Sequence, residues 1–441
     1  MKIVIIGAGQ VGSTVVAALH DEHELTVVDL DPGRLASLSY RYDVATVEGN
    51  GGSRNVLQQA GIRDAALLIA CTSRDETNLI AAMFSRKLSP ETKAVVRTTD
   101  EEYLEVWHER QLDVDLIVSS EYETAHAISR IIGVPAARQT DVFAEGKVQI
   151  VEFDVEETAS EVIGKPLREA PLPRDSKVAA IIRGDGMVIP RGSEQLQVGD
   201  RIIVIGSPRA AREWSALMSA DGARRVDDVV VFGAGRIGVS VARMLLAQHV
   251  RVRLIEADRD RARMVAELLP TARVFHATGI EPDFLERERI GRSRAAIFAM
   301  RDDTKNHYAS TLAKLHGVKF TIAVVHEQVS EEVFEHAGVD VVVNPRQVTA
   351  EELVRFAHDP RTQQVAMLEG DKYEVLDVRV RPDSEYAGRR FGDMPATGAL
   401  IGAIIRHEDV IFPHRDDVLE AGDRVIVFSE SDRVPWVEKT L

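Results

Sequence analysis

This 441-residue sequence contains a long internal repeat, which limits the folds that it can adopt. Three stretches of the first half return in the second: KIVIIGAGQVG (2–12) as DVVVFGAGRIG (228–238), DETN (75–78) as DTKN (303–306), and AAIIRGDGMVIPRGSEQLQVGDRIIVIG (179–206) as GAIIRHEDVIFPHRDDVLEAGDRVIVFS (402–429). The displacements are 226, 228 and 223 residues, so few insertions separate the halves. A repeat of this length predicts two consecutive modules of the same fold.

The sequence pattern changes once within each half. Short apolar runs such as KIVII (2–6) and LTVVD (25–29) first alternate with amphipathic stretches such as ETNLIAAMFSRKL (76–88). Strands separated by helices predict a parallel sheet that is covered on both faces. From about residue 138 the apolar runs are separated by turn signals, and residues 207–218 then predict a closing helix with Ser207 as its N-cap.

The predicted fold class is therefore α/β, with two tandem modules that each join a Rossmann-like doubly wound lobe to a small mixed α+β lobe. We expect four lobes, at residues 1–137, 138–220, 228–358 and 363–441. The stretches between the modules and lobes, 220–227 and 358–364, carry the Gly, Pro and polar residues that are typical of linkers.

Composition excludes several classes of protein. A formal charge of −16 repels phosphate backbones, so we expect no nucleic acid partner and interpret the Arg-rich stretch 251–264 as a solvated helix face. The single cysteine, Cys71, cannot form an intrachain disulfide, which indicates a reducing compartment and a buried thiol. No run approaches the ~18 apolar residues of a membrane span, and residues 1–20 read as strand, turn and helix instead of a signal peptide.

The repeated glycine turn follows a strand and opens a helix, which is the context that makes G-x-G-x-x-G a dinucleotide-binding signal. Gly7 allows the sharp turn, Gly9 lets the backbone approach a pyrophosphate, and Gly12 permits close packing of helix on sheet. The free N–H groups of the helix N-terminus attract the anion. The same three positions in the second copy are Gly233, Gly235 and Gly238.

An acidic residue ends the next strand in both copies. Asp29, with Asp31 as a less well placed candidate, and Glu256 lie where a carboxylate accepts hydrogen bonds from ribose hydroxyls and repels a 2′-phosphate. The sites should then prefer NAD or an adenine nucleotide over NADP. The alternative is that these acids only cap the helices that follow.

Further candidates lie at the carboxyl ends of two later strands, where ligands of open α/β sheets bind. Thr72 and Ser73 follow the fourth strand, and Asp75 is expected to cap the next helix. Arg97 ends the fifth strand, where it neutralises a phosphate or pairs with an acid. In the second copy Arg97 corresponds to Val325 or His326, depending on a one-residue gap.

We find no catalytic constellation in the sequence. No tyrosine is followed by lysine four residues later, no HExxH, Gly-x-Ser-x-Gly or Walker motif occurs, and His307 and His316 are too far apart to share a helix face as metal ligands. Nucleotide sites without reactive groups favour a sensor that is not an enzyme and holds no metal. A soluble NAD-dependent oxidoreductase with unrecognised catalytic groups stays open as the alternative.

The ordered set of motifs resembles the TrkA family of Trk potassium-uptake regulators, which carry two tandem RCK modules. The resemblance covers essentially the whole chain and is carried by GAGQVG (7–12), VVDLD (27–31), CTSRDETN (71–78), the duplication, and the closing VGDRIIVIG (198–206) and AGDRVIVFS (421–429). It implies a cytoplasmic regulatory subunit that binds NAD(H) and ATP or ADP and assembles as a ring, with a tetramer favoured. The ring would gate a membrane potassium-translocating subunit; a regulator of a potassium/proton antiporter is the other possibility.

The resemblance also implies nucleotide-binding residues in both copies. They are Gly7, Gly9, Gln10, Val11, Gly12, Asp29, Thr72 and Arg97 in the first, and Gly233, Gly235, Arg236, Ile237, Gly238 and Glu256 in the second.

The sequence departs from the family pattern in two places. The family often has Gly-Asp after the third strand, where this chain has Gly49-Asn50 and, in the second copy, Ala277-Thr278. Thr72 aligns with Met300, so the second copy lacks a hydroxyl group. We therefore expect weaker binding, or a different nucleotide preference, at the second site.

Overall fold

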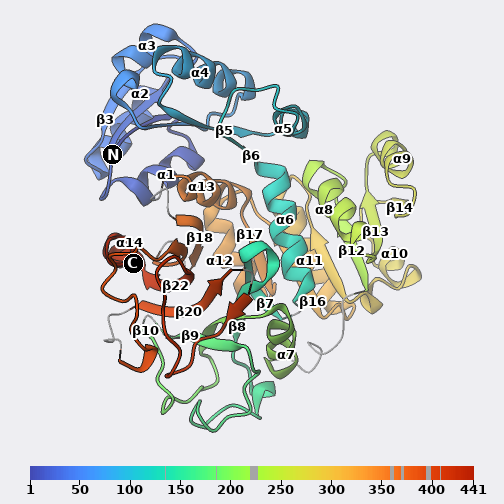
Figure 1. The fold of residues 1–441 in the computed structure, drawn as a ribbon. Coiled ribbons are helices and arrows are strands. Elements are labelled where there is room, and N and C mark those ends of the chain that lie inside the picture. The colour runs from blue at the N-terminus through green and yellow to red at the C-terminus, as the bar shows by residue number, and fades with distance from the viewer. Residues whose placement is uncertain are drawn as a thin grey trace.

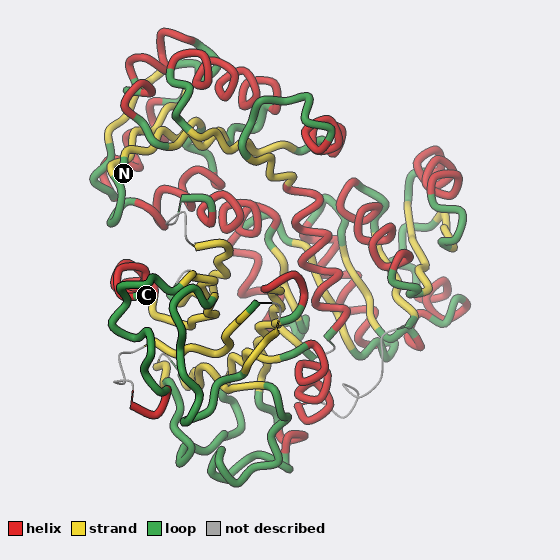
Figure 2. The backbone as a smooth tube through the Cα atoms, viewed as in Figure 1, coloured by secondary structure: helices red, strands yellow, loops and turns green. Residues whose placement is uncertain are grey.

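A computed structural model describes residues 1–134, 136–184, 186–218, 227–357, 362–368, 372–393, 399–407 and 409–441 of the chain. These residues form four sheets, which alternate along the chain between six parallel strands and five antiparallel strands. Figure 2 shows the strands as separate layers with helices packed around the parallel sheets. The predicted α/β fold with two tandem modules is confirmed, and the predicted linkers 220–227 and 358–364 lie largely outside the described residues.

The first parallel sheet has the doubly wound order β3-β2-β1-β4-β5-β6. Its strands are β1 (Lys2–Ile6), β2 (Glu24–Asp29), β3 (Ala45–Glu48), β4 (Leu67–Ala70), β5 (Lys93–Thr98) and β6 (Leu116–Ser119). The helices between and after them are α1 (Gln10–Leu19), α2 (Pro32–Arg41), α3 (Arg54–Gln59), α4 (Asp75–Leu88), α5 (Glu101–His108) and α6 (Ser120–Gly133). Because both faces are covered, β1 and β4 are buried almost throughout.

The second parallel sheet repeats this order as β14-β13-β12-β15-β16-β17. Its strands are β12 (Asp228–Phe232), β13 (Arg251–Glu256), β14 (Arg273–His276), β15 (Ala295–Phe298), β16 (Phe320–Val324) and β17 (Val341–Val343). Its helices are α8 (Arg236–Ala247), α9 (Arg259–Leu268), α10 (Pro282–Arg287), α11 (Asp303–Leu315), α12 (Gln328–His336) and α13 (Pro345–Arg355).

The two antiparallel sheets form the small lobes. The first has strands β7 (Ala137–Phe143), β8 (Val148–Asp154), β9 (Ser176–Arg183), β10 (Gly186–Val188) and β11 (Arg201–Gly206), followed by α7 (Pro208–Met218). The second has β18 (Thr362–Leu368), β19 (Tyr373–Arg379), β20 (Ala399–Arg406), β21 (Asp409–Ile411) and β22 (Arg424–Glu430), followed by α14 (Val434–Thr440). The predicted closing helix is confirmed, because Ser207 Oγ accepts a hydrogen bond from Ala210 N at the start of α7.

The stretch 251–264 was expected to be a solvated helix face, and only its second part is one. Residues 251–256 form β13, an inner strand of the second sheet with four buried residues. In α9 only Ala262 and Val265 are buried, so the arginines of this helix face solvent. The expectation was wrong for the strand because the arginines there alternate with apolar residues, which is the pattern of a strand.

The last helix of each parallel lobe packs on the other lobe. The apolar side of α6 (Ala125, Ile128, Ile131 and Ile132) lies in the core formed by β12, β13 and α8 of the second module. In return Ala350, Leu353 and Val354 of α13, with Ala357 just after the helix, lie in the core of β1, β2 and α1. Figure 1 shows α6 beside α8 and α13 below α1. The two parallel lobes are thus joined by exchanged helices, which the sequence pattern did not predict.

The small lobes also share a core. Phe143, Ile150 and Ile205 of the first small lobe pack with Val375 and Phe428 of the second. Each module therefore completes its apolar core with residues of the other, which gives the chain an approximate internal twofold arrangement.

Two properties expected from composition can be examined in the structure. Cys71 is buried, and its burial raises the pKa of the thiol to about 12, so the group stays protonated. Among the described residues, no helix is long and apolar enough to cross a membrane.

Candidate nucleotide-binding site

The glycine turn between β1 and α1 has the tight geometry that the sequence predicted for an anion-binding turn. Gly7 has φ +109°, a region that favours glycine, and a Cβ on Gly12 would lie 1.8 Å from the carbonyl oxygen of Gly7. The turn between β12 and α8 has the same geometry, with φ +98° at Gly233 and 2.0 Å between an added Cβ on Gly238 and the oxygen of Gly233. Both helices begin directly after the turn, so their first N–H groups point into the crevice.

The acid at the end of the second strand is tied to this turn. Asp29 accepts hydrogen bonds from Ala8 N at 2.6 Å and Asp31 N at 2.8 Å. Asp31, not Asp29, caps α2 by accepting from Gly33 N. The alternative in which Asp29 only caps the next helix is therefore wrong, and a carboxylate with several acceptor positions lines the crevice.

The second copy repeats this arrangement with a longer and more buried side chain. Glu256 accepts from Ala234 N and Asp258 N, each at 2.9 Å, while Asp258 caps α9. Arg261 lies 3.8 Å from the Glu256 carboxylate. Glu256 therefore does not cap the next helix, because Asp258 holds the cap position of α9.

A buried asparagine at the start of α4 organises the other side of the first crevice. The side chain of Asn78 accepts from Thr72 N and donates to the carbonyl oxygens of Thr72 and Arg97. The Thr72 hydroxyl is also within hydrogen-bond distance of Asn78 Oδ1, at 2.6 Å. Arg97 donates to Thr72 O and to Ser120 Oγ, which holds its guanidinium at the crevice.

Asp75 has a different role from the one expected. It is the first residue of α4, but its carboxylate accepts hydrogen bonds from Thr99 N, Thr99 Oγ1 and Asp100 N and does not cap the helix. The prediction was wrong because a buried loop with unpaired N–H groups lies beside the helix start, and the carboxylate satisfies those groups.

The equivalent asparagine corrects the alignment of the second copy. Asn306 bonds Met300 in the same way as Asn78 bonds Thr72, and its Nδ2 donates to Val324 O at 2.9 Å. The strand register agrees. β5 pairs with β4 from Lys93 onward, and β16 pairs with β15 from Phe320 onward, so Lys93 corresponds to Phe320. Arg97 therefore corresponds to Val324, and the expected Val325 or His326 was wrong by one or two positions.

The first crevice opens into a cavity of about 1470 Å³, which is roomy enough for a dinucleotide. Of the eight predicted residues of this site, seven line the cavity: Gly7, Gly9, Gln10, Val11, Asp29, Thr72 and Arg97. Gly12 is buried beneath the turn. Gly49 and Asn50 also line the cavity, and Asn50 Oδ1 accepts from Gly52 N, so the departure from Gly-Asp keeps an oxygen in this loop.

The six predicted residues of the second copy hold matching positions in the second lobe. Gly233 and Gly235 form the turn, Arg236, Ile237 and Gly238 open α8, and Glu256 ends β13. The replacement of Gly49-Asn50 by Ala277-Thr278 leaves the backbone arrangement intact, because Ala277 N donates to Glu256 O as Gly49 N donates to Asp29 O.

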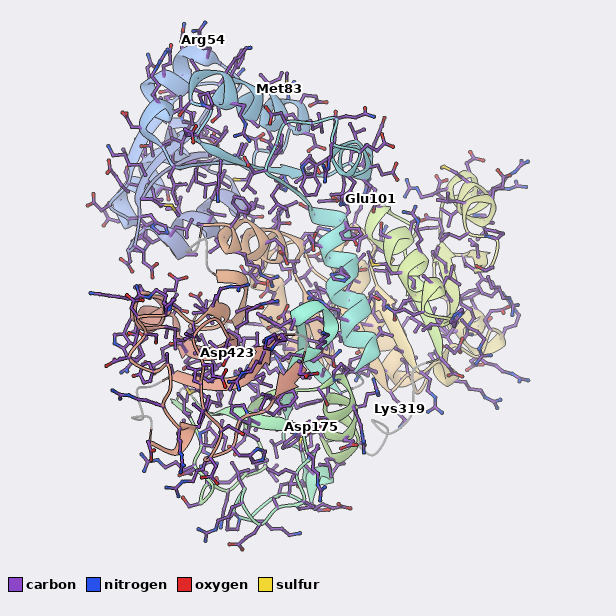
Figure 3. The ribbon with its side chains drawn as sticks, in the orientation of Figure 1. Arg54, Met83, Glu101, Asp175, Lys319 and Asp423 are labelled. Atoms are coloured by element: carbon purple, nitrogen blue, oxygen red, sulfur yellow. The ribbon has the colours of Figure 1, made fainter. Side chains whose placement is uncertain are left out.

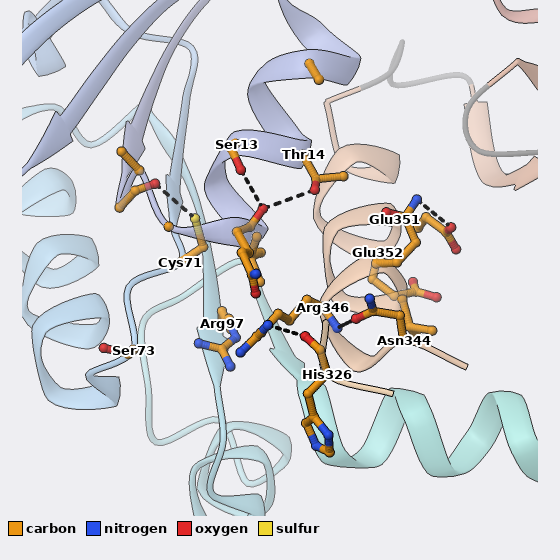
Figure 4. Close-up of a pocket in the computed structure, with 18 of the residues that line it drawn as sticks. Ser13, Thr14, Cys71, Ser73, Arg97, His326, Asn344, Arg346, Glu351 and Glu352 are labelled. Carbon is orange, nitrogen blue, oxygen red and sulfur yellow. Dashed lines mark hydrogen bonds between the residues drawn. The ribbon is translucent and has the colours of Figure 1, made fainter. Parts of the chain in front are cut away.

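Part of the first site comes from the second module. Arg346 and Gln347 of α13, together with His326, line the same cavity as the first glycine turn. Figure 4 shows the side chains of Arg97 and Arg346 next to each other in this view, carried by different modules. Arg346 donates to His326 O and lies 3.6 Å from Glu327 Oε1. No motif in the sequence marks Arg346, because it reaches the site only through the helix exchange.

The matching position on α6 carries the opposite charge. Ser119 and Asn344 cap α6 and α13, so Glu121 corresponds to Arg346. Among the residues that the structure describes, the buried Glu121 Oε2 has no hydrogen-bond partner. Burial raises the pKa of this carboxyl to about 7, although Arg97 and Arg236 oppose the shift.

The two crevices therefore differ in charge. Arg97, Arg346 and Arg74 of the first site are replaced by Val324, Glu121 and Asp302 in the second. The second site gains three cations, since Arg236, Arg243 and Arg301 stand where the first has Gln10, Ala17 and Ser73, but it loses three and acquires two acids. A polyphosphate should meet a more favourable potential in the first crevice.

Each glycine turn also touches the opposite lobe. Gln10 Nε2 donates to Glu327 Oε2 at 3.4 Å, and Arg236 NH1 donates to Thr99 O at 2.9 Å. The second contact is reinforced by ion pairs of Arg236 with Asp100 and of Arg243 with Glu101. Figure 3 places Glu101 at the joint between the first lobe and α8. The residue that follows the middle glycine thus links each crevice to the joint between the parallel lobes.

These features define a class of protein: a tandem pair of Rossmann-like modules, each with a glycine turn at a helix N-terminus and an acidic residue hydrogen-bonded to that turn, joined through their crevices. Comparison with known proteins identifies the family within this class. The TrkA-N domain model matches residues 3–120 and 229–345, and the TrkA-C domain model matches residues 150–219 and 375–441. The chain belongs to the TrkA family.

Full-length relatives and solved structures agree with this assignment. A Trk system potassium uptake protein TrkA homolog from Archaeoglobus fulgidus is 32% identical over 100% of this chain and 99% of its own length. The TrkA of Halomonas elongata is 32% identical over 97% of this chain and 95% of its own. The GsuK RCK domain shares the fold, with 20% identity, a TM-score of 0.61, and coverage of 100% of this chain and 94% of that one. The GsuK channel bound to NAD matches with 20% identity, a TM-score of 0.62, and coverage of 100% of this chain and 78% of that chain.

Proposed function

We propose that the protein is a nucleotide-sensing regulatory subunit of a Trk-type potassium-uptake system. It binds NAD(H), and competitively ATP or ADP, in the crevices of its parallel lobes. It works in the cytoplasm as a ring of several chains, with a tetramer favoured, beneath the membrane subunit that conducts potassium. It is not an enzyme, because regulation of potassium uptake by nucleotide requires binding and no chemical step.

One observation carries the proposal: each crevice lies at the joint between the two parallel lobes. Gln10 and Arg236 stand at the helix N-termini that receive the phosphates, and both contact the opposite lobe. A ligand that draws either side chain toward its phosphates changes how the lobes pack. Occupancy is thereby converted into a change of shape that a membrane subunit can sense.

The geometry also supports the ligand class. The turn at Gly7 receives a pyrophosphate, Asp29 accepts hydrogen bonds from the adenosine ribose, and the cavity has room for a second nucleoside. The carboxylate of Asp29 disfavours NADP because it repels a 2′-phosphate. Arg97 and Arg346 supply positive charge near the phosphates, which favours polyphosphates such as ATP as alternative ligands.

Regulation requires that a ligand prefer one shape of the ring over another. A ligand that binds both shapes equally shifts nothing, whereas a shift from 1:99 to 99:1 needs roughly a 10⁴-fold preference. Several crevices per ring share this requirement, so the preference needed at each crevice is smaller. Two ligands that compete for one crevice can act in opposite directions.

Potassium uptake in cells tests the function. The wild-type chain and a Gly9→Asp/Gly235→Asp variant are expressed with their membrane partner in a strain that lacks potassium uptake. We expect the wild type to support growth at low potassium and the variant to lose nucleotide control of uptake. Uptake that is identical with and without this protein would refute the regulatory function.

The oxidoreductase alternative is tested separately. The purified protein is mixed with NAD and a panel of hydroxy acids while nicotinamide absorbance is followed. We expect no change in nicotinamide absorbance beyond that caused by binding. Turnover that depends on this protein would show that it is an enzyme and not a sensor.

A further inference from the structure

The second parallel lobe carries a group of exposed cations at the end opposite its crevice. Arg289, Arg292 and Arg294 lie in and around the short turn η4 (Ile290–Arg292), and Lys319 precedes β16. A Cβ on Gly291 would lie 1.8 Å from His316 O, so η4 packs against the turn that leads to Lys319. We call these four residues the basic rim. They lie at the amino ends of the parallel strands, and Figure 3 shows Lys319 at this end of the lobe, away from Glu101 and the crevice.

The basic rim is not neutralised by the protein itself. Arg289, Arg292 and Lys319 are exposed and Arg294 is partly exposed. Neighbouring cations have carboxylate partners: Arg253 with Asp228, Arg273 with Glu288 and Lys314 with Asp340. In the part of the chain that the structure describes, the basic rim itself forms no ion pair. Four uncompensated positive charges stand out on a protein whose formal charge is −16.

The first lobe shows that the fold does not need these cations. Arg289 and Gly61 both precede a 3₁₀ turn with left-handed backbone, and Arg294 N and Ala66 N both donate to the start of the first strand. By the same register Arg292 corresponds to Asp64, and Lys319 to Thr92. The second copy has thus exchanged four uncharged or acidic residues for basic ones in an unchanged backbone.

An apolar side chain accompanies the basic rim. Leu315 ends α11 beside the turn at His316 and is 79% exposed. Its counterpart in the first lobe is Lys87. Exposed leucine among unpaired basic residues is typical of surfaces that dock on anionic lipid head groups, where the cations remain at the phosphates and the apolar side chain enters the interface.

We propose that the basic rim, with Leu315, docks the second parallel lobe on an anionic lipid membrane. The inference rests on the proposed function, which places the chain beneath a membrane subunit. Because the rim and the crevice occupy opposite ends of the same sheet, docking leaves the crevice open to nucleotide. The contact orients the ring and strengthens its attachment to the membrane.

Vesicle flotation tests the proposal. The purified full chain is mixed with vesicles of phosphatidylcholine alone or with ~30% phosphatidylglycerol, at low and physiological salt. The variant Arg289→Gly/Arg292→Asp/Arg294→Ala/Lys319→Thr installs the residues that the first lobe has at the same backbone positions, so the fold is retained. A control variant, Arg168→Asp/Arg174→Asp/Arg191→Ala, lowers the net charge equally on the exposed loops of the first small lobe.

We expect the wild type and the control variant to bind only the anionic vesicles, with binding that falls as salt rises. The rim variant should lose binding by at least ~30-fold, since each basic residue near an anionic surface contributes severalfold. Equal binding of the rim variant and the wild type, or no binding of the wild type to anionic vesicles, would overturn the proposal. Titration with NADH on the same samples separates this result from the proposed function, because nucleotide binding should be unchanged in the rim variant.

Discussion

The substitution Gly9→Asp should strongly weaken nucleotide binding at the first crevice without unfolding the protein. Gly9 is the N-cap residue of α1 with φ −72°, a conformation open to any residue, and an added Cβ meets nothing closer than an Arg34 nitrogen at 3.8 Å. Aspartate is a favoured N-cap. We therefore expect the free energy of unfolding to change by no more than about 0.5 kcal/mol.

Binding should respond much more strongly. The new carboxylate occupies the N–H groups meant for the pyrophosphate and repels it; at roughly 5 Å and an effective dielectric constant of about 20, each pair of charges costs about 3 kcal/mol. Arg34 offsets part of this, which leaves an expected loss of ~10- to 150-fold in affinity. Gly9→Ala, which adds bulk without charge, is the matched control and should lose less.

Titration calorimetry with NADH and ATP measures the effect, with Gly235→Asp as the comparison. Gly235 has φ −71° and no atom within 4 Å of an added Cβ, so both aspartates fit equally well. We expect Gly9→Asp to weaken the tighter binding event and Gly235→Asp to weaken the other one, because Arg97 and Arg346 line the first crevice. Equal losses for the two variants, or full binding by Gly9→Asp, would refute the reasoning from charge.

Three further predictions concern single side chains. Arg346→Glu should weaken ATP binding at the first crevice at least tenfold, since it installs the charge that Glu121 has in the second; Arg209→Glu on the exposed face of α7 is the control, and calorimetry measures both. Glu121→Gln should stabilise the protein more at pH 8 than at pH 5. The pKa of Glu121 in the folded state, near 7, exceeds the ordinary value of 4.5, so the wild type loses about 1–3 kcal/mol of stability as pH rises between these values. Urea unfolding measures the difference, and a difference that does not depend on pH would contradict this. Asn78→Ala and Asn306→Ala should each lower the free energy of unfolding by about 3 kcal/mol because three hydrogen bonds to the backbone are lost, while only Asn78→Ala should also weaken the tighter NADH binding; a small effect of both on unfolding would show that water replaces the amide.

Much of the architecture is encoded locally and could be predicted from the sequence. The constant displacement between the halves predicted the tandem modules, and alternating strand and helix patterns predicted the parallel sheets. The residues of the glycine turn and Asp29 were placed together because a strand, a tight turn and a helix N-terminus leave one geometry. Their role in binding nucleotide stays a prediction.

Contacts between distant segments could not be predicted in this way. The apolar stripe of α6 fits the face of either parallel lobe, so its pattern predicts burial but not the lobe on which the helix packs. The same holds for α13, and through it Arg346 reaches the first crevice. Asp75 was misassigned because the N–H groups that it satisfies lie 24 and 25 residues away.

The repeated fold and the two glycine turns follow from the sequence, because they depend on residues that are close in the chain. Only the tertiary structure shows that Arg346 and Glu121 add to the difference between the crevices that the sequence predicted, and that both crevices lie at the joint between the lobes. That outcome depends on which surfaces pack together, and such packing is set by the shape and charge of segments that are far apart in the chain, such as those of Ser120 and Thr349, which are 229 residues apart.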